Sequence, residues 1–250
     1  TCTGGTGQGL EVTNFVGGGT VSLAATGVEA LSASGNGIGI SGWATGGTAT
    51  LTDTTAVSAT GNGVNVATMG GAAVTFTNVS AAATAGTGQG FYVSGITASG
   101  AVTLDGCVGS SAGDIGLFAF TVADSAILVE GFSTITGATN GIRADAFSGT
   151  ASFSLQHSTA VGGSDNGLLA IAFVGTSSSV TASDSDLLGG NAGLYVRGFA
   201  TGGTATIANV AAEGGSKGVH IHDSSTIIVG LNNVTATATG AAGSGVKLTS

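Results

Sequence analysis

The acidic side chains best suited to acid–base chemistry lie between residues 165 and 186. Asp184 and Asp186 are two residues apart, and Asp165 precedes them by about one repeat of the chain. General acid–base cleavage of a glycosidic bond needs two carboxyl groups about 5–9.5 Å apart. A ladder of solvated turn residues also explains this trio, and we expect the ladder, so we predict no catalytic residues.

Two histidines are the best candidates for metal ligands. His220 and His222 are two residues apart, so on an extended strand their side chains point to the same side. Imidazole suits transition metals, but no Cys, Asp or Glu occupies the equivalent positions one repeat later. The chain also lacks a phosphate-binding loop, a nucleophile elbow and a zinc-ligand spacing. We therefore expect no metal site, no cofactor and no enzymatic activity.

Composition excludes several classes of protein. Thirteen acidic residues against four basic ones give a net charge of −9, which argues against nucleic acid and anionic membranes as partners. A 42% share of apolar residues is too high for a disordered chain. No apolar run approaches the roughly 18 residues of a membrane-spanning helix, so we expect no membrane insertion. Abundant Ala, Gly, Thr, Ser and Val is typical of exported bacterial surface proteins, which predicts an extracellular or cell-surface location.

Cys2 and Cys107 are the two cysteines of the chain. In a repeat protein they would lie about four coils apart, at about 4.8 Å per coil. A disulfide requires Cα atoms within about 7 Å of each other. We expect two free thiols, and an intersubunit bridge through Cys2 is the alternative.

The dominant pattern is a glycine followed at once by an apolar residue, with a second apolar residue two positions further on. It occurs ten times, at Gly9, Gly37, Gly63, Gly90, Gly116, Gly141, Gly167, Gly193, Gly218 and Gly245. The spacing is about 26 residues, and a fixed period of roughly 20–50 residues marks a repeat architecture. Because the period covers residues 1–250, we predict one continuous domain over that range.

Each repeat contains three short segments in which apolar residues alternate with polar or small ones, as in half-buried β-strands. The first follows the glycine, and the second follows a Gly/Thr/Ser turn. The third is predicted to be centred on Leu31, Val57, Ile135, Val161 and Leu187. Three strands per period without a helix predict an all-β parallel solenoid of about nine to ten coils.

Like residues are expected to stack on like residues in such a solenoid. An internal apolar column is predicted six residues after each glycine, at Phe15, Trp43, Met69, Ile96, Val122, Phe147, Phe173 and Phe199. A structural ladder is predicted just before the glycine, at Asn36, Asn62, Gln89, Asn140 and Asn166. With these columns the chain resembles the right-handed parallel β-helix superfamily, which includes pectate-lyase-like enzymes, phage tailspikes and autotransporter passenger domains. The right-handed coiling is implied by this resemblance.

The outward positions of the first strand carry an unusual set of side chains. The expected interface or ligand face consists of Tyr92, Phe118, Phe120, Arg143, Asp145, Leu169, Ile171, Tyr195, Arg197, His220 and His222. Phe118, Phe120, Leu169 and Ile171 are expected to be exposed to solvent. A contiguous exposed apolar patch marks an interaction site, and Tyr and Arg are enriched at interfaces.

The outward positions of the second strand are mostly Thr and Ser. Such a hydroxyl face raises the alternative of an ice-binding protein, although Ala126, Leu128 and Ile228 interrupt it.

The ends of the chain carry no visible caps. Residues 1–5 are predicted to form a turn before the first strand, and the last residues still read as a first strand. Open solenoid ends expose backbone and core, so we expect head-to-tail and lateral association with copies of the same chain. The preferred function is a non-enzymatic structural or adhesive solenoid that forms a surface fibre. The alternatives are an adhesin or passenger domain that binds a surface ligand, a carbohydrate-active enzyme or tailspike-like glycan binder, and an ice-binding protein.

Overall fold

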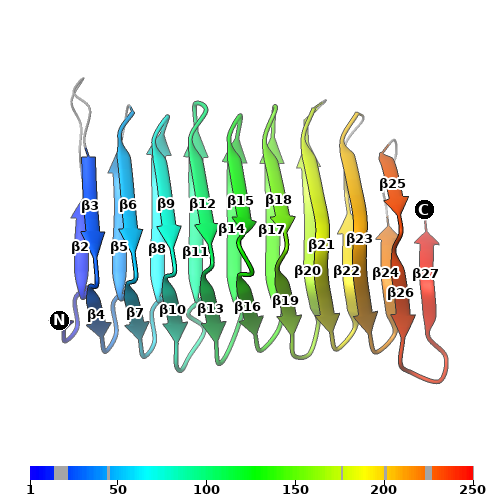
Figure 1. The fold of residues 1–250 in the computed structure, drawn as a ribbon, viewed down its shortest axis with the longest axis horizontal. Coiled ribbons are helices and arrows are strands. Elements are labelled where there is room, and N and C mark those ends of the chain that lie inside the picture. The colour runs from blue at the N-terminus through cyan, green and yellow to red at the C-terminus, as the bar shows by residue number, and fades with distance from the viewer. Residues whose placement is uncertain (14–21, 44–45, 176, 200–201, 223–226, 250) are drawn as a thin grey trace.

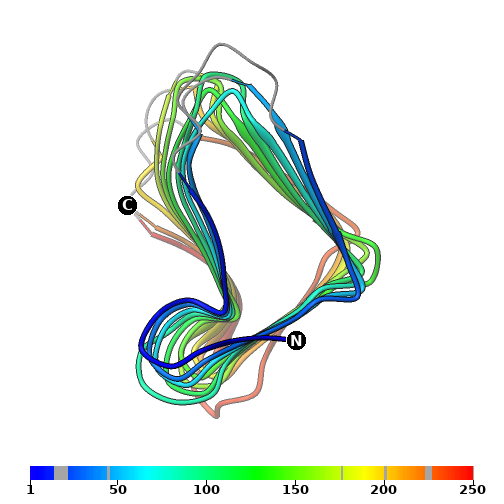
Figure 2. The same ribbon diagram turned by 90° about the vertical axis from the view of Figure 1, so that its left-hand side faces the viewer.

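The computed structural model describes residues 1–13, 22–43, 46–175, 177–199, 202–222 and 227–249. The strands stack in parallel into a β-solenoid of about nine turns, with coils of about 26 residues and no helix in the described ranges (Figure 1). This architecture confirms the predicted fold and is consistent with a right-handed parallel β-helix. Along the solenoid axis the ribbon traces three sides of each coil (Figure 2).

The first strands form a ten-stranded parallel sheet, here called sheet 1. Its members are β2 (Leu10–Thr13), β5 (Ile38–Trp43), β8 (Val64–Gly70), β11 (Phe91–Thr97), β14 (Leu117–Ala123), β17 (Ile142–Ser148), β20 (Asn166–Val174), β22 (Ala192–Arg197), β24 (Lys217–His222) and β27 (Ser244–Thr249).

The second and third strands share the other sheet. The second strands are β3 (Ser22–Thr26), β6 (Thr48–Thr52), β9 (Ala73–Thr77), β12 (Ala101–Asp105), β15 (Ala126–Glu130), β18 (Ser152–Gln156) and β25 (Ile228–Asn232). The third strands are β1 (Cys2–Gly4), β4 (Glu29–Ser32), β7 (Thr55–Ser58), β10 (Ser80–Ala83), β13 (Val108–Ser111), β16 (Thr134–Gly137), β19 (Thr159–Gly162) and β26 (Thr235–Ala238). In β21 (Ser179–Gly189) and β23 (Thr204–Gly214) one long strand passes through both positions.

The recurrent glycines lie where a turn meets sheet 1 and the backbones of adjacent coils come close. A Cβ atom added at Gly37 would lie 2.7 Å from the carbonyl oxygen of Gly63 in the next coil. That distance is too short for any real Cβ contact. The glycine period is therefore a packing requirement of coil stacking.

The predicted apolar column after these glycines is confirmed. Trp43, Met69, Ile96, Val122, Phe147, Phe173 and Phe199 are all buried, while Phe15 lies outside the described residues. Phe147 and Phe173 are stacked with ring centroids 4.7 Å apart, and Phe173 and Phe199 with centroids 4.5 Å apart. The column is thus a continuous aromatic stack in its last coils.

A bulge in sheet 1 explains why this column follows the glycine by six residues. Strict alternation would turn the fifth residue inward, but that residue has a positive φ, 56° at Thr68 and 55° at Thr121. One residue in the left-handed region breaks the alternation, as in a β-bulge, so the sixth side chain points into the core. The bulge recurs at Gly42, Gly95, Ala146, Ala172 and Gly198.

The predicted asparagine ladder is also confirmed. The side-chain oxygen of Asn36 accepts a hydrogen bond from the backbone N–H of Asn62 at 3.1 Å, and that of Asn62 accepts from Gln89 at 2.9 Å. Asn140 accepts from both the backbone and the side chain of Asn166, at 3.2 and 3.0 Å. These bonds pair polar groups at the turn before sheet 1, so the column is structural.

The third strands contain the residues on which they were predicted to be centred, but these residues do not share one column. Leu31, Val57 and Val161 occupy an outward column, whereas Ile135 and Leu187 lie in the inward one. Most inward positions hold Ala or Gly because side chains from sheet 1 already fill this part of the core. A Cβ atom at Gly109 would lie 2.9 Å from the ring of Phe91.

The prediction that residues 1–5 form a turn is wrong. Cys2–Gly4 form strand β1, which pairs with Ala30, Leu31 and Ser32 of β4. The period of 28 residues between Cys2 and Ala30 places this segment in the third-strand position, where the backbone ladder to β4 favours an extended conformation.

The second strands present outward columns at their first, third and fifth positions, and the first two of these columns carry the predicted hydroxyl face. One runs Ser22, Thr48, Ala73, Ala101, Ala126, Ser152, Ser179, Thr204 and Ile228. The other runs Ala24, Thr50, Thr75, Thr103, Leu128, Ser154, Thr181, Thr206 and Gly230. The hydroxyl array is therefore interrupted in the middle coils and again at β25.

Candidate functional site

The eleven residues predicted to form a working face all lie on the outer side of sheet 1, in two adjacent columns. We call them the outer strip. One column runs through Tyr92, Phe118, Arg143, Leu169, Tyr195 and His220, and the other through Phe120, Asp145, Ile171, Arg197 and His222. Each strand from β14 to β24 contributes one residue to each column. Strand β11 adds Tyr92, so the strip crosses six consecutive coils.

Aromatic contacts hold the N-terminal end of the strip together. Tyr92 and Phe118 meet edge to face with centroids 5.7 Å apart, and Phe118 lies 5.5 Å from Phe120. The guanidinium carbon of Arg143 lies 5.1 Å from the centre of the Phe118 ring, within the range of a cation–π interaction. The three rings and the guanidinium therefore form one cluster.

Arg143 also pairs with Asp145 in the same strand. Its Nη2 and Nε atoms donate to Asp145 Oδ2 at 2.5 and 3.2 Å. Both side chains are only partly exposed, at 34% and 14%. The pair places one positive and one negative charge side by side in the middle of the strip.

One of the four apolar residues that were predicted to be exposed, Leu169, is buried. Phe120 is 38% exposed, and Phe118 and Ile171 are half-buried, but Leu169 is only 5% exposed. Its neighbours across the sheet are Arg143 and Tyr195, whose long side chains flank the shorter leucine. Leu169 is therefore part of the packed base of the strip.

A second aromatic cluster closes the other end of the strip. The rings of Tyr195 and His220 are stacked with centroids 4.6 Å apart, and the His220 and His222 centroids lie 5.6 Å apart. His220 Nε2 lies 3.1 Å from Thr249 Oγ1 of the next coil. These contacts bury His220, which is 7% exposed.

Burial, together with the charges of Lys217, His222 and Lys247, lowers the pKa of His220 from 6.5 to about 4. The imidazole is therefore neutral at pH 7. Within the described ranges no three His, Cys, Asp or Glu side chains gather where they could hold a metal ion. The two histidines thus serve as ring-stacking partners in this arrangement.

The carboxylate trio is divided between two corners of the coil, and Asp184 and Asp186 line a common hollow. Asp184 lies at the corner of β21 between its second-strand and third-strand parts, where its Oδ1 accepts a hydrogen bond from Asn209 at 2.9 Å, as in the expected ladder. Asp165 lies at the turn that precedes sheet 1, beside Asn191 at 3.4 Å. The chain reaches that turn only after passing along the third strand, so Asp165 and Asp184 belong to different corners of the coil.

Phe132 was not among the predicted site residues, although its side chain is 83% exposed and its backbone has a φ of 63°. Its ring lies 6.2 Å from that of His157, and His157 lies 3.8 Å from Asp184. These residues line a shallow hollow of about 370 Å³ together with Thr134, Ser158, Thr159 and Asp186. The only sequence signal was an aromatic residue directly after Gly131, at the turn position that holds small or polar residues in other coils.

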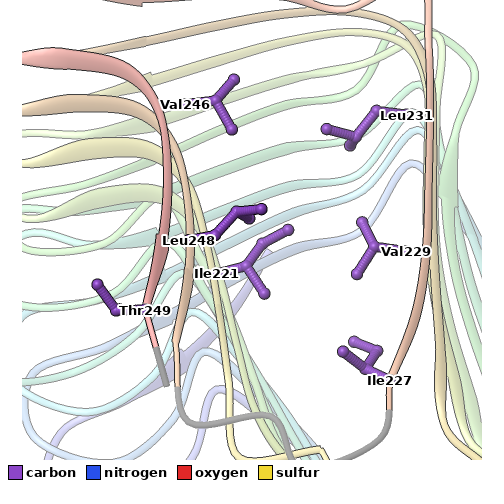
Figure 3. A pocket seen from close by; sticks show the side chains of 7 residues that line it. All are labelled: Ile221, Ile227, Val229, Leu231, Val246, Leu248 and Thr249. Atoms are coloured by element: carbon purple, nitrogen blue, oxygen red, sulfur yellow. The ribbon is translucent and has the colours of Figure 1, made fainter.

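Another hollow lies at the coil of β24, β25 and β27 (Figure 3). It has a volume of about 580 Å³ and is lined by Ile221, Ile227, Val229, Leu231, Val246, Leu248 and Thr249. Leu248 is 69% exposed, although the equivalent Ile221 in β24 is 7% exposed. The apolar columns of the core thus reach solvent at this coil.

Both cysteines are free, as predicted. Cys107 is buried, and burial raises the pKa of its thiol to about 11, which makes it unreactive at neutral pH. Among the described residues no helix is long and apolar enough to cross a membrane.

Comparisons with known proteins add no relative to this picture. The chain matches no protein-family model, no curated protein and no solved structure. The function must therefore be inferred from the geometry of the outer strip and of the coil surfaces.

Proposed function

We propose that the protein is a non-enzymatic, extracellular β-solenoid with a structural or adhesive role, which associates with itself into a surface fibre. The observation that carries this proposal is the outer strip. Its aromatic, apolar, arginine and histidine side chains lie in two unbroken columns, one across six coils and the other across five. The second strands, in contrast, present mainly Thr, Ser and Ala.

The composition of the strip matches that of protein interfaces. Tyr, Phe and Arg are enriched in interface cores, where Lys and Glu are depleted. The strip contains both tyrosines and both arginines of the chain and no lysine or glutamate. A surface that only had to remain soluble would not collect these residues on one sheet.

The register of sheet 1 is compatible with head-to-tail stacking of two copies. If β27 of one copy met β2 of another, Val246 and Leu248 would continue the inward columns of Leu10 and Val12. Lys247 would also lie in the same outward column as Glu11, so opposite charges would be neighbours. Strand β1 would meet β26 in this junction, and the outer edge of β25 would stay unpaired.

Asp184 and Asp186 line a common hollow, but the positions and partners of the other carboxylates and of Asp184 support a non-enzymatic role. Asp165 and Asp184 lie at different corners of the coil, and Asp145 forms an ion pair with Arg143. Asp184 is held by Asn209 in a ladder of turn residues, which continues from Asn209 to Asn233 at 3.0 Å. A structural ladder accounts for this carboxylate without any catalytic task.

The proposal is tested by measuring self-association of the natural full-length protein by sedimentation velocity and electron microscopy. Phe120→Lys together with Ile171→Lys should abolish lateral association, because both side chains reach solvent and lysine is strongly hydrated. Thr75→Lys together with Thr181→Lys adds the same charge to the second-strand face and should leave association unchanged. A monodisperse monomer at high concentration of the native protein would overturn the proposal.

The hollow beside Phe132 supports a second candidate, an adhesin or passenger domain that binds a surface ligand such as a glycan. An exposed aromatic ring next to hydroxyl and carboxylate groups is a suitable platform for a sugar ring. A glycan array probed with the native protein and with Phe132→Ala tests this candidate. Binding that is unaffected by the substitution, or no binding at all, would exclude the hollow as the site.

A further inference from the structure

We infer that the outer strip binds the outer strip of a second copy of this chain, face to face, about a twofold axis parallel to the solenoid axis. The inference rests on the proposed self-association and specifies the partner surface and its orientation. The argument starts from the order of side chains along each strand of sheet 1.

Each strand of the strip carries two outward side chains, two residues apart, which we call a row. The rows are Phe118/Phe120, Arg143/Asp145, Leu169/Ile171, Tyr195/Arg197 and His220/His222. A twofold axis parallel to the solenoid reverses the strand direction and keeps each coil opposite its own copy. Each row therefore meets itself in reverse order.

Every row is complementary to its own reversal. Phe118 would face the partner's Phe120, Leu169 would face the partner's Ile171, and Tyr195 would face the partner's Arg197. Aromatic and aliphatic groups then meet their own kind, and an arginine lies against a tyrosine ring. An interface with twofold symmetry requires self-complementarity of this kind.

The charged row, Arg143/Asp145, fits this orientation. With the axis parallel to the solenoid, Arg143 faces the partner's Asp145 and Asp145 faces the partner's Arg143. The existing pair, joined by Nη2–Oδ2 and Nε–Oδ2 contacts of 2.5 and 3.2 Å, would become a square of four alternating charges. An axis parallel to the strands through the middle row, Leu169/Ile171, would also pair Asp145 with an arginine, the partner's Arg197. It would, however, place the Phe118/Phe120 row against the partner's His220/His222 row, so the match of the phenylalanines with their own kind favours the first orientation.

The coils of β5 and β8, which precede the strip, leave room for the partner. Their outward residues are Gly39, Ser41, Asn65 and Ala67, which are small or uncharged. The strip spans six strands spaced about 4.8 Å apart and is smaller than the roughly 800 Å² that each partner buries in a standard interface. We therefore expect a weak dimer whose population rises with protein concentration.

A charge-exchange experiment on the full natural chain tests the interface. Arg143→Asp makes the charged row doubly negative and Asp145→Arg makes it doubly positive, so each variant alone should lose lateral dimerisation in sedimentation velocity. An equimolar mixture of the two variants should restore it, because a negative row then meets a positive row. Thermal unfolding of each variant establishes that it is folded, and the exchanged variant Arg143→Asp/Asp145→Arg should dimerise by itself.

The orientation is tested by a spin label at Ser41→Cys in a Cys2→Ser background, with the distance measured by pulsed electron paramagnetic resonance. Copies of β5 are neighbours when the axis is parallel to the solenoid, so a short distance is expected. A long distance, with the labels at opposite ends of the dimer, would overturn this orientation. If the native protein associates and Arg143→Asp associates equally well, the inference fails and the proposed function stands. If the native protein never associates, both fail.

Discussion

Replacement of Phe173 by alanine tests the central element of the fold, the apolar column behind the bulge of sheet 1. The side chain is fully buried and lies between the parallel rings of Phe147 and Phe199, at 4.7 and 4.5 Å. Removing the ring deletes two stacking contacts, each worth about 0.5–1.5 kcal/mol beyond area burial. It also leaves a cavity that the neighbouring coils cannot close, because their backbones are held by the ladders of both sheets.

The expected loss in the free energy of unfolding is about 3–5 kcal/mol, as for other buried phenylalanines changed to alanine. It is measured by urea denaturation followed by circular dichroism. Because each coil contacts only its neighbours, amide exchange should accelerate most in β17, β20 and β22. These are the strands that carry or precede the three rings.

Phe120→Ala is the matched control. It makes the same chemical change in the same sheet, but the Phe120 side chain points outward and is 38% exposed. The expected loss is about 1–2 kcal/mol, since the ring buries only part of its apolar area and leaves no closed cavity when it is removed. Equal losses for the two variants, or a loss below about 1 kcal/mol for Phe173→Ala, would refute the assignment of this column to the core.

Three further predictions concern the surface. Burial lowers the His220 pKa from 6.5 to about 4, so the unfolded chain takes up the proton first, and the stability linked to this group is present above pH 6.5 and lost as the pH falls toward 4. The free energy of unfolding should therefore fall between pH 7 and pH 5 by up to about 2 kcal/mol more in the native protein than in His220→Gln, and equal pH slopes would contradict this. We expect no polysaccharide-cleaving activity in the native protein or in Asp184→Asn/Asp186→Asn. A depolymerase activity of the native protein that disappears in this variant would show the protein to be an enzyme. Thermal hysteresis should be weak and insensitive to Thr50→Lys, because Leu128 interrupts its column; strong hysteresis lost in this variant would identify an ice-binding face.

The arrangement in coils, the repeat period and the residues of the outer strip could all be predicted from the sequence alone. The glycine at the start of each repeat is needed because the backbones of adjacent coils touch there, as at Gly37 and Gly63. Period-two alternation assigned inward and outward positions correctly in the first half of each sheet 1 strand and in the second strands. Both patterns are local, so they can be recognised without knowledge of distant contacts.

Which side chains are buried where several elements meet could be seen only in the tertiary structure. Leu169 looked exposed by alternation, but Arg143 and Tyr195 flank it across the sheet. The inward side of the third strand holds small residues because rings such as that of Phe91 already fill the space. The bulge depends on one residue adopting a positive φ, which neither Thr68 nor Thr121 signals by its type. The separation of Asp165 from Asp184 depends on the path of the chain around the coil. Each of these features arises from contacts between coils or between sheets, and the order of residues along one strand does not specify them.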